Sequence, residues 1–278
     1  MIVFLNGEFV PEERAVVSVF DRSFRYGDAL FETMRVQNGK VFRWPQHFAR
    51  LQCTRAFLKI PLPCSADEWL ATAQELLRQN EMRDALLRIQ LSRGTGPRGY
   101  APTGGEKPFV VMSLHTLPVG ETAPWKLIIS SLRIPANDPL PGHKTANRLL
   151  QVLAAAEARE RGADEALLLN TNGELTEGSA SNVFWIEGDT VCTPPLDGGA
   201  LPGVTRATVL ELCRSHGISC AEKTIGPGEL LNCEGVFLTL TSRGIVEAES
   251  VDGLPLRRSL ITTQLRKEFE ALLQRECA

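Results

Sequence analysis

The fold is decided by Glu177-Gly178-Ser179-Ala180-Ser181-Asn182-Val183-Phe184, which is followed by Val191-Cys192-Thr193 and by Leu201-Pro202-Gly203-Val204-Thr205-Arg206. The last segment precedes an apolar helical pattern, and the free backbone N–H groups and dipole of a helix start can bind a phosphate. Upstream, Lys144 lies where a loop meets a helix. We interpret residues 143–206 as a cofactor site in which a lysine forms a Schiff base, an acid holds a ring nitrogen and a helix start holds a phosphate.

The composition is that of an ordinary globular protein. Hydrophobic residues make up 43% and charged residues 23% of the 278 residues, which argues against a disordered or fibrous chain. The length allows two modest domains or one large α/β domain. The net charge is −3, and the basic residues are dispersed among acidic ones. This pattern argues against binding to nucleic acid or to a membrane surface and favours a small-molecule substrate.

The cysteines and the first residues indicate a cytoplasmic protein. The seven cysteines never form a Cys-x-x-Cys motif, so neither a disulfide framework nor a metal site is expected. The N-terminus, Met1 to Glu8, lacks a basic segment followed by a long apolar one. The sequence also has no apolar run of the roughly 20 residues that a transmembrane helix needs.

The first part of the chain predicts a small α/β domain at residues 1–117. Asn6-Gly7 and Asn38-Gly39 are typical of hairpin turns, so a meandering antiparallel sheet is expected. Ser65 and Glu68 fit a capping box. The glycine-rich loop at 92–107 is a candidate substrate rim. The predicted strands are 2–5, 8–10, 16–20, 31–36, 40–42, 85–91 and 108–114, and the predicted helices begin near 45 and 65.

An interdomain loop is predicted at 118–124, where Pro118, Gly120 and Pro124 interrupt the pattern. A larger C-terminal domain would then occupy 125–278. Gly162 and Gly217 are expected to end two of its helices. Its predicted strands are 126–133, 166–169, 183–186, 190–193, 236–240 and 245–248, and its predicted helices begin near 149, 203 and 259.

Three side chains could carry the chemistry of the site. Lys144 would become a nucleophile only if desolvation or a nearby cation lowered its pKa, and a solvated surface lysine is the alternative. A carboxylate at Glu177 would keep a pyridine nitrogen protonated, although the residue also fits a surface turn. Asn182 lies among strand residues, where asparagine is disfavoured. Its amide could therefore make a specific hydrogen bond or cap a neighbouring loop.

Hydroxyl and basic groups could bind a phosphate. Val204 and Thr205 open the helix that follows Gly203, and Thr241 ends a strand pattern. Arg50 lies on an amphipathic helix and could be either a phosphate ligand or a solvated cation. Each feature alone is also compatible with an ordinary cap, strand end or surface position.

These residues resemble the signature of the class IV, fold-type IV pyridoxal-phosphate enzymes, which include branched-chain aminotransferases, D-amino-acid aminotransferases and aminodeoxychorismate lyases. The matching positions are Glu177-x-Ser179-x-x-Asn182-Val183-Phe184, Val191-x-Thr193 and Leu201-x-Gly203-Val204-x-Arg206. The likeness extends to Tyr26–Thr33, to His47-x-x-Arg50-Leu51, to Lys144 and to Thr241, and so covers nearly the whole chain.

The resemblance implies an α/β (α+β) fold with a small N-terminal domain, a larger C-terminal domain with a barrel-like sheet, and a cytoplasmic homodimer with its active site at the interface. The implied cofactor is pyridoxal 5'-phosphate, and Lys144 is the implied catalytic residue. The implied cofactor-binding residues are Arg50, Lys144, Glu177, Ser181, Asn182, Val204, Thr205 and Thr241, and the implied substrate-binding residues are Phe31, Thr33, Arg35, Arg98 and Tyr100.

The resemblance leaves two reactions open. The segment from Ser92 to Tyr100 and the run Asn147-Arg148-Leu149 resemble the lyases, and paired arginines suit a diacid. D-amino-acid aminotransferases, however, carry an arginine and a histidine in the positions of Arg98 and Tyr100 and a tyrosine in the position of Phe31. Some lyases carry an asparagine where this chain has Leu240.

The leading hypothesis is a 4-amino-4-deoxychorismate lyase that eliminates pyruvate to leave 4-aminobenzoate for folate synthesis. The alternative is an aminotransferase for D-amino acids or branched-chain amino acids with 2-oxoglutarate or pyruvate. A hypothesis of a different class is a non-catalytic homologue that keeps the fold for binding.

Overall fold

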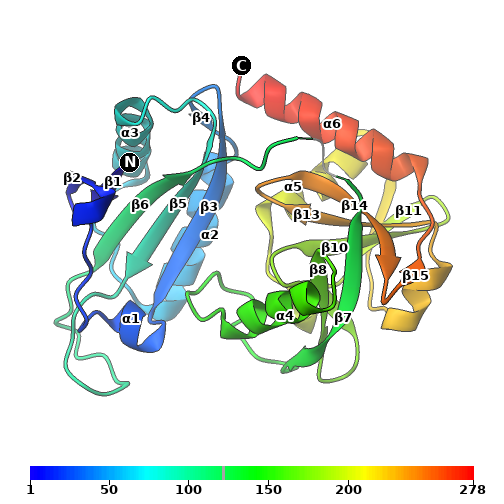
Figure 1. The fold of residues 1–278 in the computed structure, drawn as a ribbon, viewed down its shortest axis with the longest axis horizontal. Helices are drawn as coiled ribbons and strands as arrows, with labels where there is room; N and C mark the ends of the chain where they lie inside the picture. Colours follow the sequence, from blue (N-terminus) through cyan, green and yellow to red (C-terminus); the bar gives the residue numbers. More distant parts are fainter. Residues whose placement is uncertain (121–122) are drawn as a thin grey trace. The chain divides into compact units, whose positions relative to one another are not determined.

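The computed structural model describes residues 1–120 and 123–278, and the chain divides into two compact units (Figure 1). Unit 1 comprises Met1–Pro118, His143–Asn147 and Gln274–Ala278, and unit 2 comprises Val119–Gly142 and Arg148–Leu273. The predicted interdomain loop, 118–124, includes residues 121 and 122, which lie outside the described residues. The sequence did not predict that two short later segments return to unit 1.

Unit 1 contains an antiparallel sheet in the order β2-β1-β6-β5-β3-β4. Both predicted hairpin turns are confirmed: φ is 48° and 109° at Asn6 and Gly7, and 52° and 77° at Asn38 and Gly39. Positive φ at two successive residues is what a type I′ turn requires. The strands are β1 (Ile2–Leu5), β2 (Glu8–Pro11), β3 (Ala29–Gln37), β4 (Lys40–Val41), β5 (Ala85–Ser92) and β6 (Phe109–His115).

Two helices contribute to the core on one face of this sheet: α2 packs on β3, and α3 packs on β1 and β6 (Figure 1). The predicted capping box is present at the start of α3, between Ser65 and Glu68. Alternation along β3 sends Leu30 and Met34 into this core. The other face of the sheet therefore keeps half-buried side chains. The helices are α1 (Arg22–Tyr26), α2 (Trp44–Leu58) and α3 (Ala66–Gln79), and Glu12–Arg14 form a 3-10 turn.

The predicted strand at 16–20 is wrong. The segment is irregular, and Val16, Val19 and Phe20 are exposed. Its β-branched and aromatic residues suit a strand, but a strand also needs a partner, and this segment has none among the described residues. Instead it leads into Asp21, whose carboxylate accepts the Ser23 N–H and caps α1.

Unit 2 contains a larger mixed sheet in the order β12-β11-β10-β13-β14-β7-β8-β9, with β15 paired to β14. The pairs β7–β8, β7–β14 and β11–β12 are parallel. Because β9, at one end of this order, also contacts β10, the sheet curls into a half-barrel. The strands are β7 (Trp125–Ile134), β8 (Glu165–Asn170), β9 (Leu175–Gly178), β10 (Asn182–Glu187), β11 (Thr190–Thr193), β12 (Ser219–Glu222), β13 (Gly235–Leu240), β14 (Gly244–Val251) and β15 (Leu254–Pro255).

Small side chains pack the first helix of unit 2 against its sheet. Ala154 and Ala158 of α4 are buried against Ile128, Ala166 and Leu168 of β7 and β8. Among the described residues, none of the helices combines the length and apolarity needed to cross a bilayer. The helices are α4 (Leu149–Glu160), α5 (Val204–Ser215) and α6 (Leu260–Glu276), with 3-10 turns at Leu196–Gly198 and Pro227–Asn232.

Candidate active site

Lys144 lies in a short segment that runs beside the first residues of β3. The Phe31 N–H donates to the carbonyl of Lys144 at 3.0 Å, and the Ala146 N–H donates to the carbonyl of Ala29 at 2.8 Å. The N–H of Lys144 itself donates to Thr54 Oγ1 of α2 at 3.3 Å. The backbone of the lysine is therefore fixed by strand-like bonding, and its side chain is half-buried.

Two cations contact the ring of Phe31. Lys144 Nζ lies 4.7 Å from the ring centroid, and the guanidinium carbon of Arg88 lies 4.0 Å from it. Arg88 stands opposite Thr33 in the β3–β5 register, and burial lowers its pKa below the ordinary value. Among the described residues it has no carboxylate within ion-pair distance. Sequence reasoning missed Arg88, although it is the lone charged residue of a predicted apolar strand, 85–91.

A buried charged triad lies on the opposite face of β3. Glu32 accepts from His47 Nδ1 at 2.8 Å, from Arg50 Nε at 2.8 Å and from Arg50 Nη2 at 2.7 Å. Burial alone would raise the pKa of Glu32, but the charge and hydrogen bonds of Arg50, with the hydrogen bond of His47, hold it at about 2. Burial also lowers the pKa of His47. The triad therefore fixes the guanidinium of Arg50 against an ionised carboxylate.

The remaining predicted substrate residues of unit 1 fall into two groups. Thr33 and Arg35 share the half-buried face of β3 with Phe31. Buried Arg35 Nε has no hydrogen-bond partner among the described residues. Arg98 and Tyr100 lie instead on the loop between β5 and β6, where both are exposed. Only the first group shares a sheet face with Arg88.

In unit 2, Glu177 and Asn182 both form hydrogen bonds with the backbone of Leu201. Glu177 Oε2 accepts the N–H of Leu201 at 2.8 Å, and Asn182 Nδ2 donates to the carbonyl of Leu201 at 2.9 Å. A Cβ on Gly203 would stand 2.0 Å from Asn182 Oδ1, so only glycine fits there. Asn182 thus makes a specific hydrogen bond by capping a neighbouring loop. The acid is thereby tied to the turn that opens α5.

Among the described residues, the first turn of α5 has no side-chain cap. Its N-cap, Gly203, makes no side-chain cap, so the first N–H groups remain open to an anion. Val204 and Thr205 are buried in this first turn. Thr239, which pairs with Asn182 across β13 and β10, has a buried hydroxyl without a hydrogen-bond partner among the described residues. A buried hydroxyl in this state requires a partner such as an ordered water or a bound ligand.

Ser181, a predicted cofactor-binding residue, is hydrogen-bonded to a carboxylate of unit 2. Its hydroxyl donates to Glu165 Oε2 at 2.9 Å. The same buried carboxylate accepts the N–H of Ser179 at 3.0 Å and that of Ala180 at 3.2 Å. Glu165, which sequence reasoning missed, therefore holds the turn between β9 and β10, and with it the spacing of Glu177 and Asn182. Thr241 lies in the turn after β13 and is half-buried.

Each unit, taken by itself, carries groups that suit a part of pyridoxal 5'-phosphate. The Lys144 amine could react with its aldehyde, and the Glu177 carboxylate could bind its protonated ring nitrogen. The open N–H groups of α5, with the hydroxyls of Thr205 and Thr241, could bind its phosphate.

Comparison with known proteins gives the same family. The family model for amino-transferase class IV matches residues 29–251. A Methanocaldococcus jannaschii protein, provisionally named a branched-chain-amino-acid aminotransferase, is 34% identical over 97% of this chain and 96% of its own length. The D-alanine aminotransferase of Bacillus licheniformis is 32% identical, covering 91% of this chain and 89% of that protein. The aminodeoxychorismate lyase of Vibrio harveyi is also 32% identical, covering 84% and 87%.

Solved structures agree with the fold. The branched-chain amino acid aminotransferase of Escherichia coli superposes with a TM-score of 0.92 and 28% identity, covering 98% of this chain and 94% of that one. The half-barrel sheet and the mixed α/β units are therefore those of fold-type IV. The chain belongs to the class IV aminotransferase family of pyridoxal-phosphate-dependent transaminases and lyases.

Proposed function

We propose that the enzyme is an aminotransferase that exchanges amino groups between amino acids and keto acids. The observation that carries this proposal is the pair of cations on the Phe31 ring, Lys144 and Arg88. Arg88 is half-buried and lacks a carboxylate partner among the described residues. A substrate carboxylate would supply the missing negative charge beside the reactive amine.

Lys144 and Glu177 would have separate tasks. Pyridoxal phosphate, when bound, supplies an electron-accepting ring. Lys144 would hold the cofactor covalently through Nζ and, once displaced by the substrate amino group, would take the proton from the substrate α-carbon. Glu177, fixed by the N–H of Leu201, would keep the ring nitrogen protonated. Asn182 would support Glu177 by holding the carbonyl of the same residue.

Each unit carries donors that are suited to a phosphate. In unit 2 these are the N–H groups of Val204 and Thr205 and the hydroxyls of Thr205 and Thr241. In unit 1 the donor is Arg50, whose orientation is set in advance by two hydrogen bonds to Glu32. A guanidinium that is already ordered loses little conformational freedom on binding an anion.

The substrate would contact residues from two parts of unit 1. Phe31, Thr33 and Arg35 would line the site from the half-buried face of β3. Arg98 and Tyr100 would approach a carboxylate from the exposed loop between β5 and β6. These assignments follow from the family resemblance together with the sheet face that carries Lys144 and Arg88.

A second candidate function is elimination of pyruvate from 4-amino-4-deoxychorismate for folate synthesis. It is favoured by the loop sequence from Ser92 to Tyr100 and by the Vibrio harveyi relative. Asn147, the other lyase-like feature, lies beside Gly27: its Oδ1 would be 2.9 Å from a Cβ at that position.

A substrate panel on the purified, cofactor-loaded enzyme tests the reaction. Exchange between D-alanine or a branched-chain amino acid and 2-oxoglutarate, without pyruvate release from aminodeoxychorismate, supports the aminotransferase. The opposite result supports the lyase. Lys144→Ala should abolish the visible absorbance of the covalently held cofactor, whereas Lys126→Ala, at an exposed position, should keep it. A wild-type protein that never shows this band with added cofactor would be a non-catalytic homologue.

We also propose that the enzyme is a homodimer with its active site at the interface. Leu149, Val152 and Leu153 form an apolar row on α4 and are 70%, 59% and 49% exposed. Phe20 and Phe24 of unit 1 are 63% and 74% exposed. Exposed apolar groups of this size are typical of surfaces that bind protein.

Light scattering after size-exclusion chromatography tests the assembly. Val152→Asp should convert the dimer to a monomer, because a charge in an apolar interface must be desolvated. Ala155→Asp provides the matched control, since Ala155 is exposed on the same helix but outside the apolar row. A wild-type monomer, or a Val152→Asp dimer as stable as that of the control, would contradict the proposal.

A further inference from the structure

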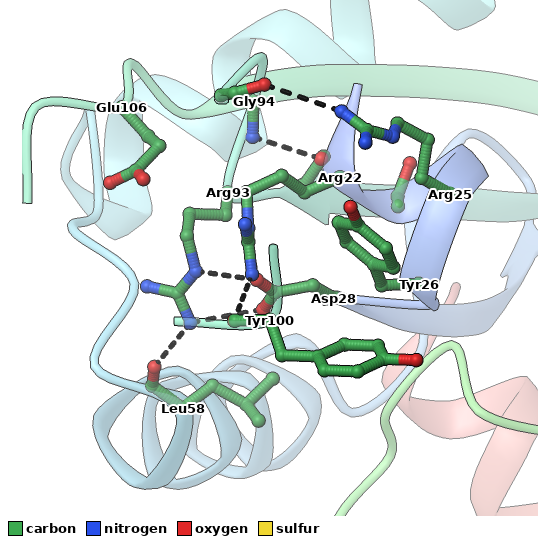
Figure 2. A network of polar contacts seen from close by, with 12 residues as sticks. Arg22, Arg25, Tyr26, Asp28, Leu58, Arg93, Gly94, Tyr100 and Glu106 are labelled. Carbon is green, nitrogen blue, oxygen red and sulfur yellow. Dashed lines mark hydrogen bonds and ion pairs between the residues drawn. The ribbon is translucent and has the colours of Figure 1, made fainter. Parts of the chain in front are cut away.

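A charged network joins the loop between β5 and β6 to the turn around α1 (Figure 2). Asp28 Oδ2 accepts from Arg22 Nε at 2.7 Å and from Arg93 Nε at 2.7 Å, and Asp28 Oδ1 accepts from Arg93 Nη2 at 2.9 Å. Both arginine side chains are almost fully buried. One carboxylate therefore serves two guanidinium groups, whose remaining N–H groups need other acceptors.

Those acceptors are backbone carbonyls from two different segments. Arg93 donates to the carbonyls of Leu58 at 2.7 Å and Lys59 at 3.2 Å, at the C-terminal end of α2, where the helix dipole favours a cation. Arg22 donates to the carbonyls of Gly99 at 3.0 Å and Tyr100 at 2.6 Å. Arg93 thus anchors the end of β5, whereas Arg22 anchors the tip of the loop.

The loop tip has little apolar support. Tyr100 is 86% exposed, and its ring meets that of Tyr26 edge to face at 5.5 Å. The N–H of Gly99 donates to the hydroxyl of Tyr26 at 3.2 Å. The base of the loop is closed at Gly94, where a Cβ would stand 1.8 Å from the carbonyl oxygen of Lys107. Between these points, Gly96 makes two long hydrogen bonds: its N–H donates to the carbonyl of Phe20 at 3.4 Å, and its carbonyl accepts from Arg25 Nη1 at 3.5 Å. The two bonds from the Arg22 guanidinium are shorter and hold the tip itself.

The pKa of Asp28 is lowered, which favours its ionised form. Burial would raise it, but the hydrogen bonds and charges of Arg93 and Arg22 outweigh burial and hold the pKa below its ordinary value. The carboxylate consequently stays charged at neutral pH and keeps both arginines in place. A neutral side chain at this position would leave two buried cations without a counter-charge.

We propose that Arg22 is a positioning residue for substrate binding. By holding the carbonyls of Gly99 and Tyr100, it fixes the loop backbone from which Arg98 and Tyr100 reach the substrate carboxylate. The inference rests on the proposed function, because it concerns the carboxylate-binding loop of that enzyme. Arg22 touches neither the cofactor residues nor Lys144, so its loss should change substrate affinity and leave the cofactor chemistry intact.

Steady-state kinetics of the cofactor-loaded enzyme test this role. Arg22→Met should raise KM for the amino-acid substrate by about tenfold or more, since it removes several charge-assisted hydrogen bonds. The kcat should stay within about threefold, and the visible cofactor band should keep its wavelength and pH titration. The KM of Arg22→Lys should lie between those of the wild type and Arg22→Met. One ammonium group can pair with Asp28 but cannot span both carbonyls. Arg78→Met, which removes an exposed arginine paired with Glu75, should behave as wild type.

Two results would overturn the inference. One is a wild-type KM in Arg22→Met; the other is a fall in kcat that equals the fall in kcat/KM. If Arg22→Met does not fold, Arg22→Lys and Asp28→Asn test the inference instead. Each weakens the ion pair between Arg22 and Asp28 and should raise KM. Wild-type enzyme without turnover on any amino substrate would overturn both this inference and the proposed function. Wild-type turnover with an unchanged KM in the variants would overturn this inference alone.

Discussion

Replacing Glu32 with glutamine should destabilise the protein by about 3 kcal/mol at neutral pH. The charge and hydrogen bonds of Arg50, with the bond from His47, overcome burial and hold the pKa of Glu32 at about 2, below its ordinary 4.5. Each pKa unit corresponds to about 1.4 kcal/mol, so the shift amounts to about 3 kcal/mol. Glutamine has the shape of the neutral acid, and Glu32→Gln therefore measures the contribution of the charge.

The pH dependence has a definite sign. Because the pKa of Glu32 is lower in the folded than in the unfolded protein, its contribution is complete above pH 4.5 and is lost as pH falls towards about 2. The difference in the free energy of unfolding between wild type and Glu32→Gln should shrink over this interval. Urea unfolding followed by tryptophan fluorescence can measure it, since Trp44 and Trp69 lie in the core of unit 1.

Glu75→Gln is the matched control. The hydrogen bonds of Arg78 and Gln79 also bring the pKa of Glu75 to about 2, but this pair lies on the solvent-exposed surface of α3. Water and salt screen an exposed pair, so the control should unfold like wild type. The reasoning from burial would be refuted if Glu75→Gln lowered the free energy of unfolding as much as Glu32→Gln does. It would also be refuted if the decrease caused by Glu32→Gln did not change with pH.

Three further predictions concern the site. Arg88→Met should raise KM for carboxylate substrates by about tenfold or more while the cofactor band is unchanged, because it removes a half-buried charge with no carboxylate partner among the described residues. Equal KM values in the variant and the wild type would contradict this. Gly203→Ala should raise the Kd of the cofactor by about tenfold or more, since the new Cβ would stand 2.0 Å from Asn182 Oδ1; equilibrium dialysis measures it. Ser181→Ala should cost about 1 kcal/mol of stability through the lost bond to Glu165 and leave the cofactor Kd unchanged. A tenfold weaker Kd would instead show that Ser181 binds the cofactor, as the family resemblance implies.

Local sequence signals predicted most of the elements because each depends on neighbours along the chain. Asn6-Gly7 and Asn38-Gly39 formed the expected turns, and Ser65 with Glu68 formed the expected capping box. The strand predicted at 16–20 failed because strand formation also requires a partner at long range. Residue preference alone carries no information about that partner.

The position of Lys144 could be predicted along the chain but not in space. The sequence placed it after a proline-containing loop and before a helix, as observed. Its backbone contacts to Phe31 and Thr54, however, join residues far apart in sequence. Parallel neighbours such as β7 and β14 are unpredictable for the same reason, since no turn motif connects them.

Charged residues within the predicted strands were the strongest indication of the site that sequence reasoning missed. Glu32 and Arg88 interrupt apolar strand patterns on opposite faces of one sheet; Glu32 is buried and Arg88 is half-buried. Removing a charge from water is costly unless an opposite charge or hydrogen bonds compensate for it. For Glu32, Arg50 and His47 compensate inside the fold. Arg88 has no comparable partner among the described residues. Because a substrate carboxylate would supply the charge opposite to this half-buried cation, we expect the Arg88 face of the sheet to be the one that meets the substrate, whereas Glu32 orients Arg50 from the other face.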